Sequence, residues 1–294
     1  MHPAVNSHFY SLIAISLWAT SYILTKLAME TYTAGAMGLV RNVVGSAVLL
    51  AVVRHLRLKP PERKDWILFF VSGLTGLGLY MYVFNRGTVL TGATTSCVLI
   101  ATAPVFTALA ASFLFGERIR AAGWGAIALA FAGILVMTLW RGTLDVNVGV
   151  FWLLGASLLL CFYFLLQRRL TLRYGILQIT AWSFVAGATA LLPFLPETLH
   201  VLRTAPARHT LMVVYMGVFP SALGYLAWVK ALSIAPKTSY VTNYMFLTPV
   251  LSLFLEFAVT GVFPDDGTLL GGAMILTALA LFSVFGKESA KAGA

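Results

Sequence analysis

The chain has 294 residues, of which 60% are hydrophobic and only 10% are charged, and its formal net charge is +10. An ordinary soluble domain is roughly 45–50% apolar and about 25% charged, so a water-soluble domain of this size could not bury so much apolar surface. Disorder is excluded as well, because it requires low hydrophobicity and high charge. The composition therefore indicates a protein that crosses a membrane several times.

The positive charge does not indicate a nucleic-acid partner. A nucleic-acid-binding protein presents a basic face on a soluble module, whereas these Lys and Arg residues fall in short segments between apolar runs. Cys97 and Cys161 lie within apolar runs without CxxC spacing, so we expect free thiols and neither a zinc site nor a disulfide. HExxH, GxSxG and P-loop motifs are absent from the sequence, so we expect no enzyme activity, no catalytic residues, no metal and no cofactor.

Ten apolar segments are long enough to cross a bilayer core of about 30 Å, which needs roughly 20 apolar residues per helix. They are Phe9–Met29, Ala34–Val53, Trp66–Arg86, Ala93–Phe115, Ala121–Trp140, Val148–Leu170, Ile176–Leu195, Thr210–Ala231, Thr238–Thr260 and Thr268–Phe285. We therefore predict an all-α membrane protein with ten transmembrane helices. The first segment lacks the basic flank and the cleavage site of a signal peptide, so we expect it to be retained.

The distribution of Lys and Arg predicts the orientation of these spans. An even number of spans places both termini on one side of the membrane. With the N-terminus in the cytoplasm, 14 basic residues fall in cytoplasmic segments and 3 in outer loops. The positive-inside rule therefore predicts a multi-pass protein of the inner (plasma) membrane with both termini cytoplasmic.

The two halves of the chain resemble each other, because Pro104 aligns with Pro249 at an offset of 145 residues and the surrounding residues align as well. Each half holds five spans, an odd number, so the two halves must insert with opposite orientation. Such inverted repeats are typical of secondary transporters, which bind substrate near the midplane between the halves. We predict two inverted five-helix repeats, residues 1–144 and 145–294.

Pro104 and Pro249 lie mid-span at equivalent positions of the two predicted repeats. One interpretation is a static kink whose freed backbone groups are satisfied by neighbouring helices. The other is a matched pair of hinges for alternating access. Both interpretations stay open at this point.

Two stretches carry a resemblance to a known family: LWATSYILTK over Leu17–Lys26, and APVFTALAASFLFGERI over Ala103–Ile119, in which Glu117 closes the fourth span. With Arg41 and the arrangement of spans, they resemble the EamA-type ten-helix members of the drug/metabolite transporter superfamily. The resemblance implies that spans one, three, four, six, eight and nine surround a central cavity and that spans five and ten pack together. The second repeat departs from the pattern, since no glutamate stands where Glu117 would map.

The resemblance also implies a function. We expect a secondary transporter, and by family resemblance an exporter, of small metabolites such as amino acids. The alternatives are an exporter of cationic or drug-like compounds and, from another class, a membrane-embedded enzyme that acts on a lipid. Related small multidrug resistance proteins carry an essential glutamate in their first helix, and Trp18 falls at that place here, which disfavours cation antiport. The expected partners are a small-molecule substrate and the lipid bilayer. A monomeric protein is compatible with the sequence.

Aromatic and polar side chains on the spans expected to face the cavity are the candidate substrate-binding residues. They are Trp18, Tyr22, Tyr80, Tyr82, Asn85, Tyr163, Trp228, Asn243 and Tyr244. Ligand sites are mostly apolar and aromatic with a few placed polar groups, and this set has that character. Span eight also carries Tyr225. Tyr and Trp near span ends form interfacial belts, which is the alternative role for any single member of the set.

Apart from the basic residues counted with the cytoplasmic segments, four charged side chains fall within the predicted spans: Lys26, Arg41, Arg86 and Glu256. Such groups are costly inside a membrane, so each is a functional hypothesis. Glu256 is interpreted either as a carboxylate that couples transport to protons or binds a cation, or as a fixed partner of one of the three basic residues. The basic residues either snorkel to the headgroups or form structural pairs, and Arg41 is interpreted as a structural pair or hydrogen-bond anchor.

Overall fold

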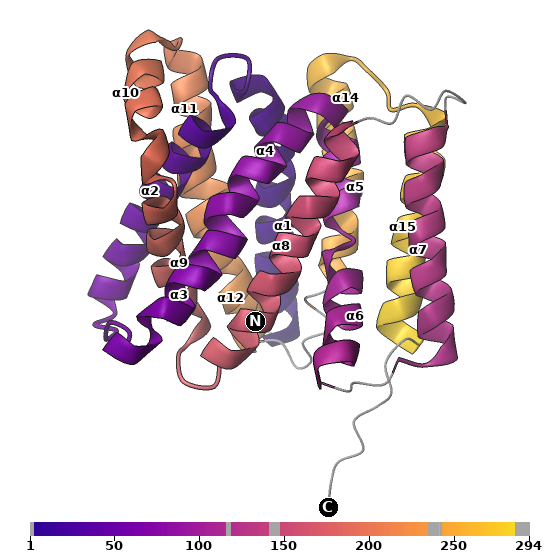
Figure 1. The fold of residues 1–294 in the computed structure, drawn as a ribbon, viewed down its shortest axis with the longest axis horizontal. Helices are drawn as coiled ribbons and strands as arrows, with labels where there is room; N and C mark the ends of the chain where they lie inside the picture. Colours follow the sequence, from indigo (N-terminus) through magenta and orange to yellow (C-terminus); the bar gives the residue numbers. More distant parts are fainter. Residues whose placement is uncertain (1–2, 116–118, 141–147, 235–240, 242, 286–294) are drawn as a thin grey trace, which may run out of the picture.

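The computed structural model describes residues 3–115, 119–140, 148–234, 241 and 243–285. These residues form helices and turns, with no β-strand among them. The long helices run between two opposite faces of the molecule (Figure 1). The predicted all-α fold is therefore confirmed.

Up to residue 139 the elements are α1 (Pro3–Ala28), α2 (Ala34–His55), η1 (Arg63–Asp65), α3 (Trp66–Gly73), η2 (Leu74–Gly78), α4 (Leu79–Thr91), α5 (Ala93–Ile100), α6 (Ala103–Phe115) and α7 (Ala121–Leu139). From residue 148 they are α8 (Val148–Leu170), α9 (Ile176–Ala190), η3 (Leu192–Phe194), α10 (Leu195–Thr204), α11 (Ala207–Met216), η4 (Gly217–Leu223), α12 (Gly224–Ile234), η5 (Asn243–Leu247), α14 (Thr248–Thr260) and α15 (Asp266–Phe285). Most of the predicted spans thus correspond to one helix or to a run of consecutive helices.

Seven helical segments of the described chain are long and apolar enough to cross a membrane, or eight if α9 and the bent continuation through α10 form one span. The predicted fifth and ninth spans correspond to shorter apolar helices, α7 and α14. The start of the predicted ninth span, at Thr238, lies outside the described residues. Large apolar side chains such as Phe113 and Ile67 are exposed on the outside of the bundle, as lipid contact requires. The chain is a multi-pass membrane protein, and the count of ten spans stays a prediction.

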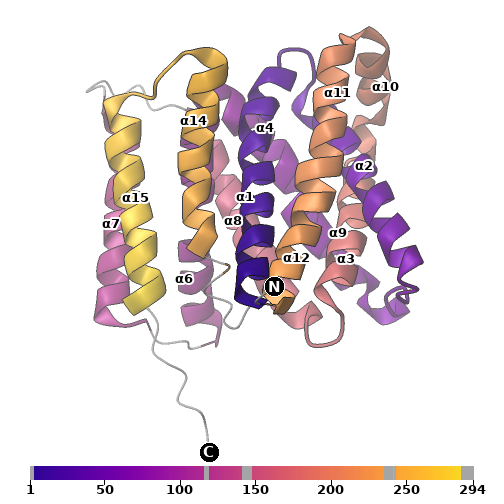
Figure 2. The same cartoon turned by 180° about the vertical axis from the view of Figure 1, so that it is seen from behind.

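The start of α1 and the end of α15 lie at the same face of the molecule, together with the α2–α3 and α8–α9 connections (Figures 1 and 2). We call this the N-terminal face. The α1–α2, α10–α11 and α14–α15 connections lie at the other face, which we call the opposite face. This arrangement matches the expectation that the first and last spans begin and end on one side.

Several helices begin or end at residues suited to those positions. Thr33 precedes α2, and its side chain accepts a hydrogen bond from the Ala36 N–H group, which would otherwise lack a partner. Gly261 ends α14 with a left-handed φ of 66°, a conformation that glycine adopts at little cost. The Asp265 carboxylate then accepts from the Thr268 N–H group at 2.7 Å and so caps the start of α15.

Two long segments each contain a π-helical turn, η2 between α3 and α4 and η4 between α11 and α12. Such turns are rare and frequently occur at functional sites. Pro220 lies inside η4 and lacks an N–H group, which favours a break in the regular helix there. Both turns fall near the middle of a segment long enough to span a membrane. The structure thus interrupts two helices at comparable depth.

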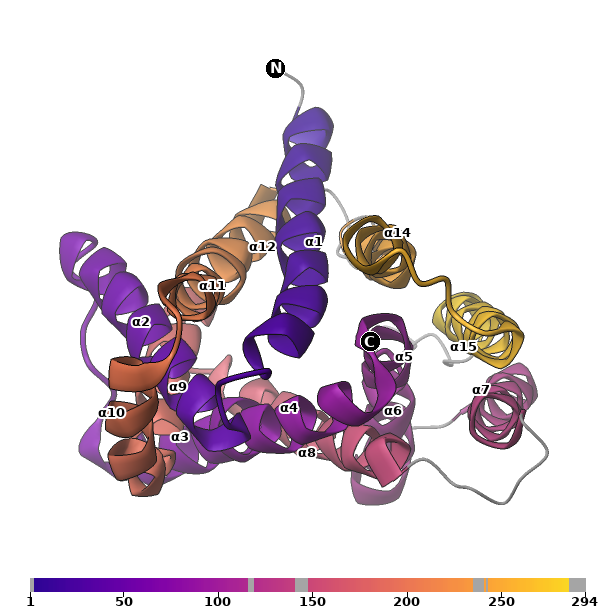
Figure 3. The ribbon, with the colours of Figure 1, turned by 90° about the horizontal axis from the view of Figure 1, so that it is seen from above.

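Helices α7 and α15 pack side by side at one edge of the molecule (Figure 3). A methyl group added to Gly133 would lie 2.7 Å from the Gly271 carbonyl oxygen, and one added to Gly271 would lie 2.5 Å from the Gly133 oxygen. Small residues at such positions let two helix backbones approach closely. The expectation that spans five and ten pack against each other is confirmed.

The helix α1 contacts elements from both parts of the chain. It contacts α4 and α5 from the first part of the chain and α11, α12 and α14 from the second part. In the view from above, α4, α5, α12 and α14 are arranged around it (Figure 3). Side chains on α1 therefore meet groups from both parts of the chain.

Pro104 and Pro249 lie at the starts of helices rather than inside them. Each is the second residue of its helix, α6 and α14 respectively. A short turn at Ala101 and Thr102 precedes α6, and the 3-10 turn η5 precedes α14. Proline is favoured in the first turn of a helix because its missing N–H group has no partner there anyway. The aligned prolines thus mark aligned breaks in the two helical runs.

Candidate functional site

Among the arginines that the structure describes, Arg41 is the buried one. Arg41 is about two turns into α2, and only 7% of it is exposed. Its Nε donates a hydrogen bond of 2.8 Å to Oγ of Ser221, which lies in the π-helical turn η4. Arg41 thus connects the first part of the chain to the second at the depth of the two helix interruptions.

Three tyrosines interact with this arginine. The guanidinium interacts electrostatically with the phenol groups of Tyr80 on α4, Tyr225 on α12 and Tyr22 on α1. A fourth, Tyr163 on α8, is 2% exposed and interacts with Tyr225. We call these residues, Arg41, Ser221 and the four tyrosines, the central cluster.

Aromatic rings extend the central cluster along α1. The Trp18 ring lies 5.5 Å from that of Tyr225 and 5.1 Å from that of Trp228. Tyr22 packs edge-on against Phe84 at 5.5 Å. The indole N–H of Trp18 donates to the carbonyl oxygen of Pro220 at 3.0 Å, so this side chain also stabilises the break in η4. Five of the nine predicted substrate-binding residues, Trp18, Tyr22, Tyr80, Tyr163 and Trp228, thus lie in or against the central cluster.

A second polar cluster lies toward the opposite face. The Glu256 carboxylate on α14 accepts hydrogen bonds from the Thr94 N–H and hydroxyl groups, both at 2.7 Å, and from the Ala93 N–H group at 3.1 Å. Lys26 Nζ, near the end of α1, lies 3.2 Å from the same carboxylate. The contacts join α1, α5 and α14, and we call this group the opposite-face cluster.

The opposite-face cluster shows which of the three basic residues pairs with Glu256. Lys26 pairs with it, whereas Arg41 belongs to the central cluster. Arg86 is exposed, and its guanidinium lies over the Trp152 ring at 5.8 Å. The geometry therefore favours the interpretation of Glu256 as a fixed partner of Lys26.

Two of the remaining predicted residues lie on other surfaces of α4. The Tyr82 ring stacks on that of Phe194 at 5.3 Å. The Asn85 side chain is buried and donates from Nδ2 to the Ala34 carbonyl oxygen at 3.0 Å, and its Oδ1 has no hydrogen-bond partner in the described chain. No hydrogen bond or ring contact links either of them to the central cluster, and their interactions connect α4 to other helices.

The predicted pair Asn243 and Tyr244 lies near the N-terminal end of α1. The Tyr244 hydroxyl is 2.9 Å from Nδ1 of His8. Asn243 begins η5, and its side chain lies outside the described part of the structure, as does Glu117. This pair is therefore apart from the central cluster along α1.

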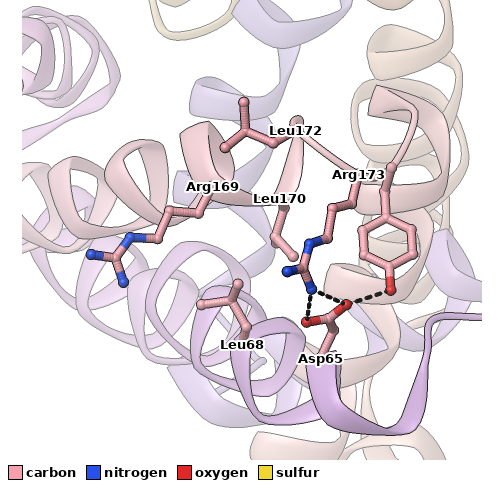
Figure 4. A pocket seen from close by; sticks show the side chains of 7 residues that line it. Asp65, Leu68, Arg169, Leu170, Leu172 and Arg173 are labelled. Atoms are coloured by element: carbon pink, nitrogen blue, oxygen red, sulfur yellow. Dashed lines mark hydrogen bonds and ion pairs between the residues drawn. The ribbon is translucent and has the colours of Figure 1, made fainter.

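A third polar group lies at the N-terminal face, where α3 begins and α8 turns into α9 (Figure 4). The Asp65 carboxylate accepts from Arg173 Nη1 at 3.1 Å and from the Tyr174 hydroxyl at 2.7 Å. The Tyr174 hydroxyl in turn accepts from the Glu62 N–H group. Desolvation and the hydrogen bond to Asp65 raise the pKa of the Tyr174 phenol above its ordinary value. Beside this group is a cavity of about 370 Å³, and the residues that line it are Asp65, Leu68, Arg169, Leu170, Leu172, Arg173 and Tyr174.

Sequence reasoning did not single out Ser221. The signal was its position directly after Pro220, because a proline inside an apolar span frees backbone groups that polar neighbours satisfy. Among the described residues no group of three or more His, Cys, Asp or Glu side chains could hold a metal ion. The chemistry of the site therefore rests on Arg41, hydroxyl groups and aromatic rings.

Comparison with known proteins identifies the family. The model of the EamA-like transporter family matches twice, over residues 6–139 and over residues 147–284. The chain belongs to the EamA-like transporter family. It is therefore a member of the drug/metabolite transporter superfamily, as the resemblance predicted.

The relatives of this EamA-family chain include proteins named for different cargoes. It is 30% identical to a Streptantibioticus cattleyicolor protein named "Probable terminal-alkyne amino-acid exporter", over 92% of this chain and 91% of that protein. It is 25% identical to a Rickettsia felis protein named "S-adenosylmethionine uptake transporter", over 75% of this chain and 74% of that protein. A crystal structure with 20% sequence identity superposes with a TM-score of 0.63, over 95% of this chain and 97% of that one, which supports the fold.

Proposed function

We propose that this chain is a secondary transporter that exports small metabolites, amino acids above all, across the plasma membrane by alternating access. The observation that carries the proposal is the central cluster, a buried arginine that interacts with three tyrosines, one of which packs against Trp18. Ligand sites have this composition, mostly apolar and aromatic with a few placed polar groups. Helices from both parts of the chain contribute to it, as expected for a site between two moving halves.

The cargo and the direction of transport have different support. The name of the Streptantibioticus relative supports amino acids and export, whereas the name of the Rickettsia relative describes uptake. The aromatic surfaces of Trp18 and Trp228 favour an amino acid with an aromatic or bulky apolar side chain.

The proposed architecture consists of inverted repeats 1–144 and 145–294. Three observations support it: the family model matches twice, each match region contains a π-helical turn, and Pro104 and Pro249 begin aligned helices. The N-terminal face would be cytoplasmic, because it carries the basic α2–α3 and α8–α9 connections. A monomer is the assembly we propose.

The charge of Arg41 argues against the alternative of a cationic or drug-like cargo. Two like charges 4 Å apart repel by about 4 kcal/mol at an effective dielectric constant of 20, a value typical of proteins. A lipid-modifying enzyme usually needs clustered histidines or carboxylates, and the described residues contain no cluster of three or more. Glu256, already bonded to Lys26 and Thr94, does not supply one.

Uptake into proteoliposomes tests the proposal. The purified chain is reconstituted, and a panel of labelled amino acids is offered with and without an imposed pH gradient. Saturable uptake without a gradient would identify a facilitator, and uptake only with the gradient would identify proton coupling. If the folded protein moved no amino acid under either condition, the proposed function would be refuted, and cationic compounds would be tested next.

A further inference from the structure

The hydrogen bonds of Arg41 leave most of its guanidinium without partners. A guanidinium carries five N–H donors. Only one of them, on Nε, has an acceptor among the described residues, which is Ser221 Oγ. The four donors on the two terminal nitrogens have none there, although the residue is more than nine-tenths buried.

The charge of Arg41 lacks a counter-charge as well. No aspartate or glutamate of the described chain forms an ion pair with it, and Glu256 is bonded elsewhere. Its neighbours are phenol groups, which are neutral near pH 7. Arginine keeps its proton when it is buried, so an anionic group that accepts from the free N–H donors would stabilise the guanidinium.

We infer that Arg41 binds the carboxylate group of the transported substrate. The inference rests on the proposed function and specifies its substrate class: carboxylates that carry an apolar side chain, with neutral amino acids as the physiological form. The planar fork of a guanidinium matches the two oxygens of a carboxylate. Phosphate would bring a further negative charge, for which the central cluster offers no second cation.

The rest of the central cluster fits the rest of an amino acid. The phenol groups of Tyr22, Tyr80 and Tyr225 interact electrostatically with the guanidinium, and their hydroxyl oxygens can accept hydrogen bonds from an ammonium group beside the carboxylate. Aromatic faces also attract ammonium groups, so no acidic residue is needed for this contact. The rings of Trp18 and Trp228 supply apolar surface for the side chain.

Substrate analogues that lack one group test the inference. Labelled phenylalanine uptake into proteoliposomes is measured in competition with phenylalaninamide and phenethylamine, which lack the carboxylate, and with 3-phenylpropionate, which lacks the ammonium. We expect phenylalanine and phenylpropionate to compete, and the two compounds without a carboxylate to compete at least tenfold more weakly. Equal competition by phenylalaninamide would overturn the inference and leave the proposed function standing.

Variants of Arg41 show whether this residue provides the discrimination. Arg41→Gln should abolish the preference for carboxylates, and Arg41→Lys, which keeps the charge but not the fork, should raise KM about tenfold and retain part of the preference. Arg86→Gln is the matched control, because it removes the same charge from an exposed arginine that lies over Trp152. A purely structural role for Arg41 would lower uptake without changing the ratio between analogues, and that result would contradict the inference.

Binding provides a readout that does not depend on flux. Titration of 3-phenylpropionate is followed by tryptophan fluorescence in detergent, with Trp18 and Trp228 beside the proposed site. Saturable binding that Arg41→Lys weakens would support the inference even if no amino acid were transported. Absence of binding to the folded wild-type protein, or equal binding by Arg41→Lys and wild type, would overturn it.

Discussion

Glu256 and Thr94 lie 162 residues apart in the chain and share two hydrogen bonds of 2.7 Å. One of them comes from a backbone N–H group in the first turn of α5, a helix whose start has no capping side chain of its own. A carboxylate at a helix N-terminus is favourable because it satisfies free N–H groups and interacts with the helix dipole. Glu256 also forms an ion pair with Lys26. This one side chain therefore connects α1, α5 and α14 near the opposite face.

Glu256→Gln should destabilise the protein. The variant loses the negative charge that Lys26 and the two backbone donors contact, and removing one partner of such bonds costs on the order of 1–3 kcal/mol. We expect a lower apparent melting temperature in detergent, and Glu197→Gln, an exposed substitution on α10, serves as the control. A variant with unchanged stability that lost only pH-driven uptake would instead identify Glu256 as a coupling carboxylate.

Gly92→Ala should affect the same cluster through the backbone. Gly92 joins α4 to α5 with a φ of 109°, a conformation that residues with a Cβ rarely adopt. The added methyl group would also lie 3.1 Å from Glu256 Oε1. We expect a loss of about 1–2 kcal/mol in stability. Gly175→Ala, where φ is negative and nothing lies within 4 Å of the new methyl group, should be close to neutral in the same melting experiment.

Gly133→Ala should separate α7 from α15. The new methyl group would lie 2.7 Å from a backbone oxygen of Gly271, which cannot move as a flexible side chain could. Overpacking of this kind costs about 1–3 kcal/mol. Gly125→Ala, in the same helix but without any neighbour within 4 Å, should leave thermal stability unchanged. Equal melting temperatures for the two variants would contradict the described helix contact.

Tyr174→Phe should weaken the N-terminal face. The variant loses both the bond donated to Asp65 and the bond accepted from the Glu62 N–H group, and we expect the melting temperature to fall by about 2 °C. Because the pKa of Tyr174 is raised, its contribution is present in full below the ordinary tyrosine pKa and is lost only as pH rises through the higher folded-state value. The difference between wild type and variant should therefore be constant from pH 6 to about pH 9. A difference that varied across this range would point to another titrating group.

The fold was largely predictable because membrane spans have a strong signal in composition. Apolar runs and loop charges predicted helices and a common face for the first and last spans, and the family resemblance implied the contact between α7 and α15. Pro104 lies mid-span as expected, within Ala93–Leu114, but both it and Pro249 also begin helices, which the sequence did not predict. Hydropathy does not detect such breaks, since an apolar run continues across them.

The candidate site was only partly predictable, because sequence shows which residues share a helix but not which helix face each occupies. Tyr80 joins the central cluster, whereas Tyr82, two positions along the same helix, stacks on Phe194. Successive residues on a helix are rotated by about 100°, so neighbours in sequence face different partners. Ser221 was not predicted as a site residue, because a serine in an apolar span is common. Its role becomes visible only when the structure places Arg41 beside it.

The most direct test of the account is a counterflow experiment with phenylalanine. Proteoliposomes that contain the wild-type chain are loaded with unlabelled phenylalanine and diluted into a trace of labelled phenylalanine, without any ion gradient. A carrier whose single site opens alternately to the two faces should produce a transient accumulation of label inside, and liposomes without protein should not. Binding of phenylalanine without any counterflow would contradict transport and would indicate a protein that senses the amino acid instead.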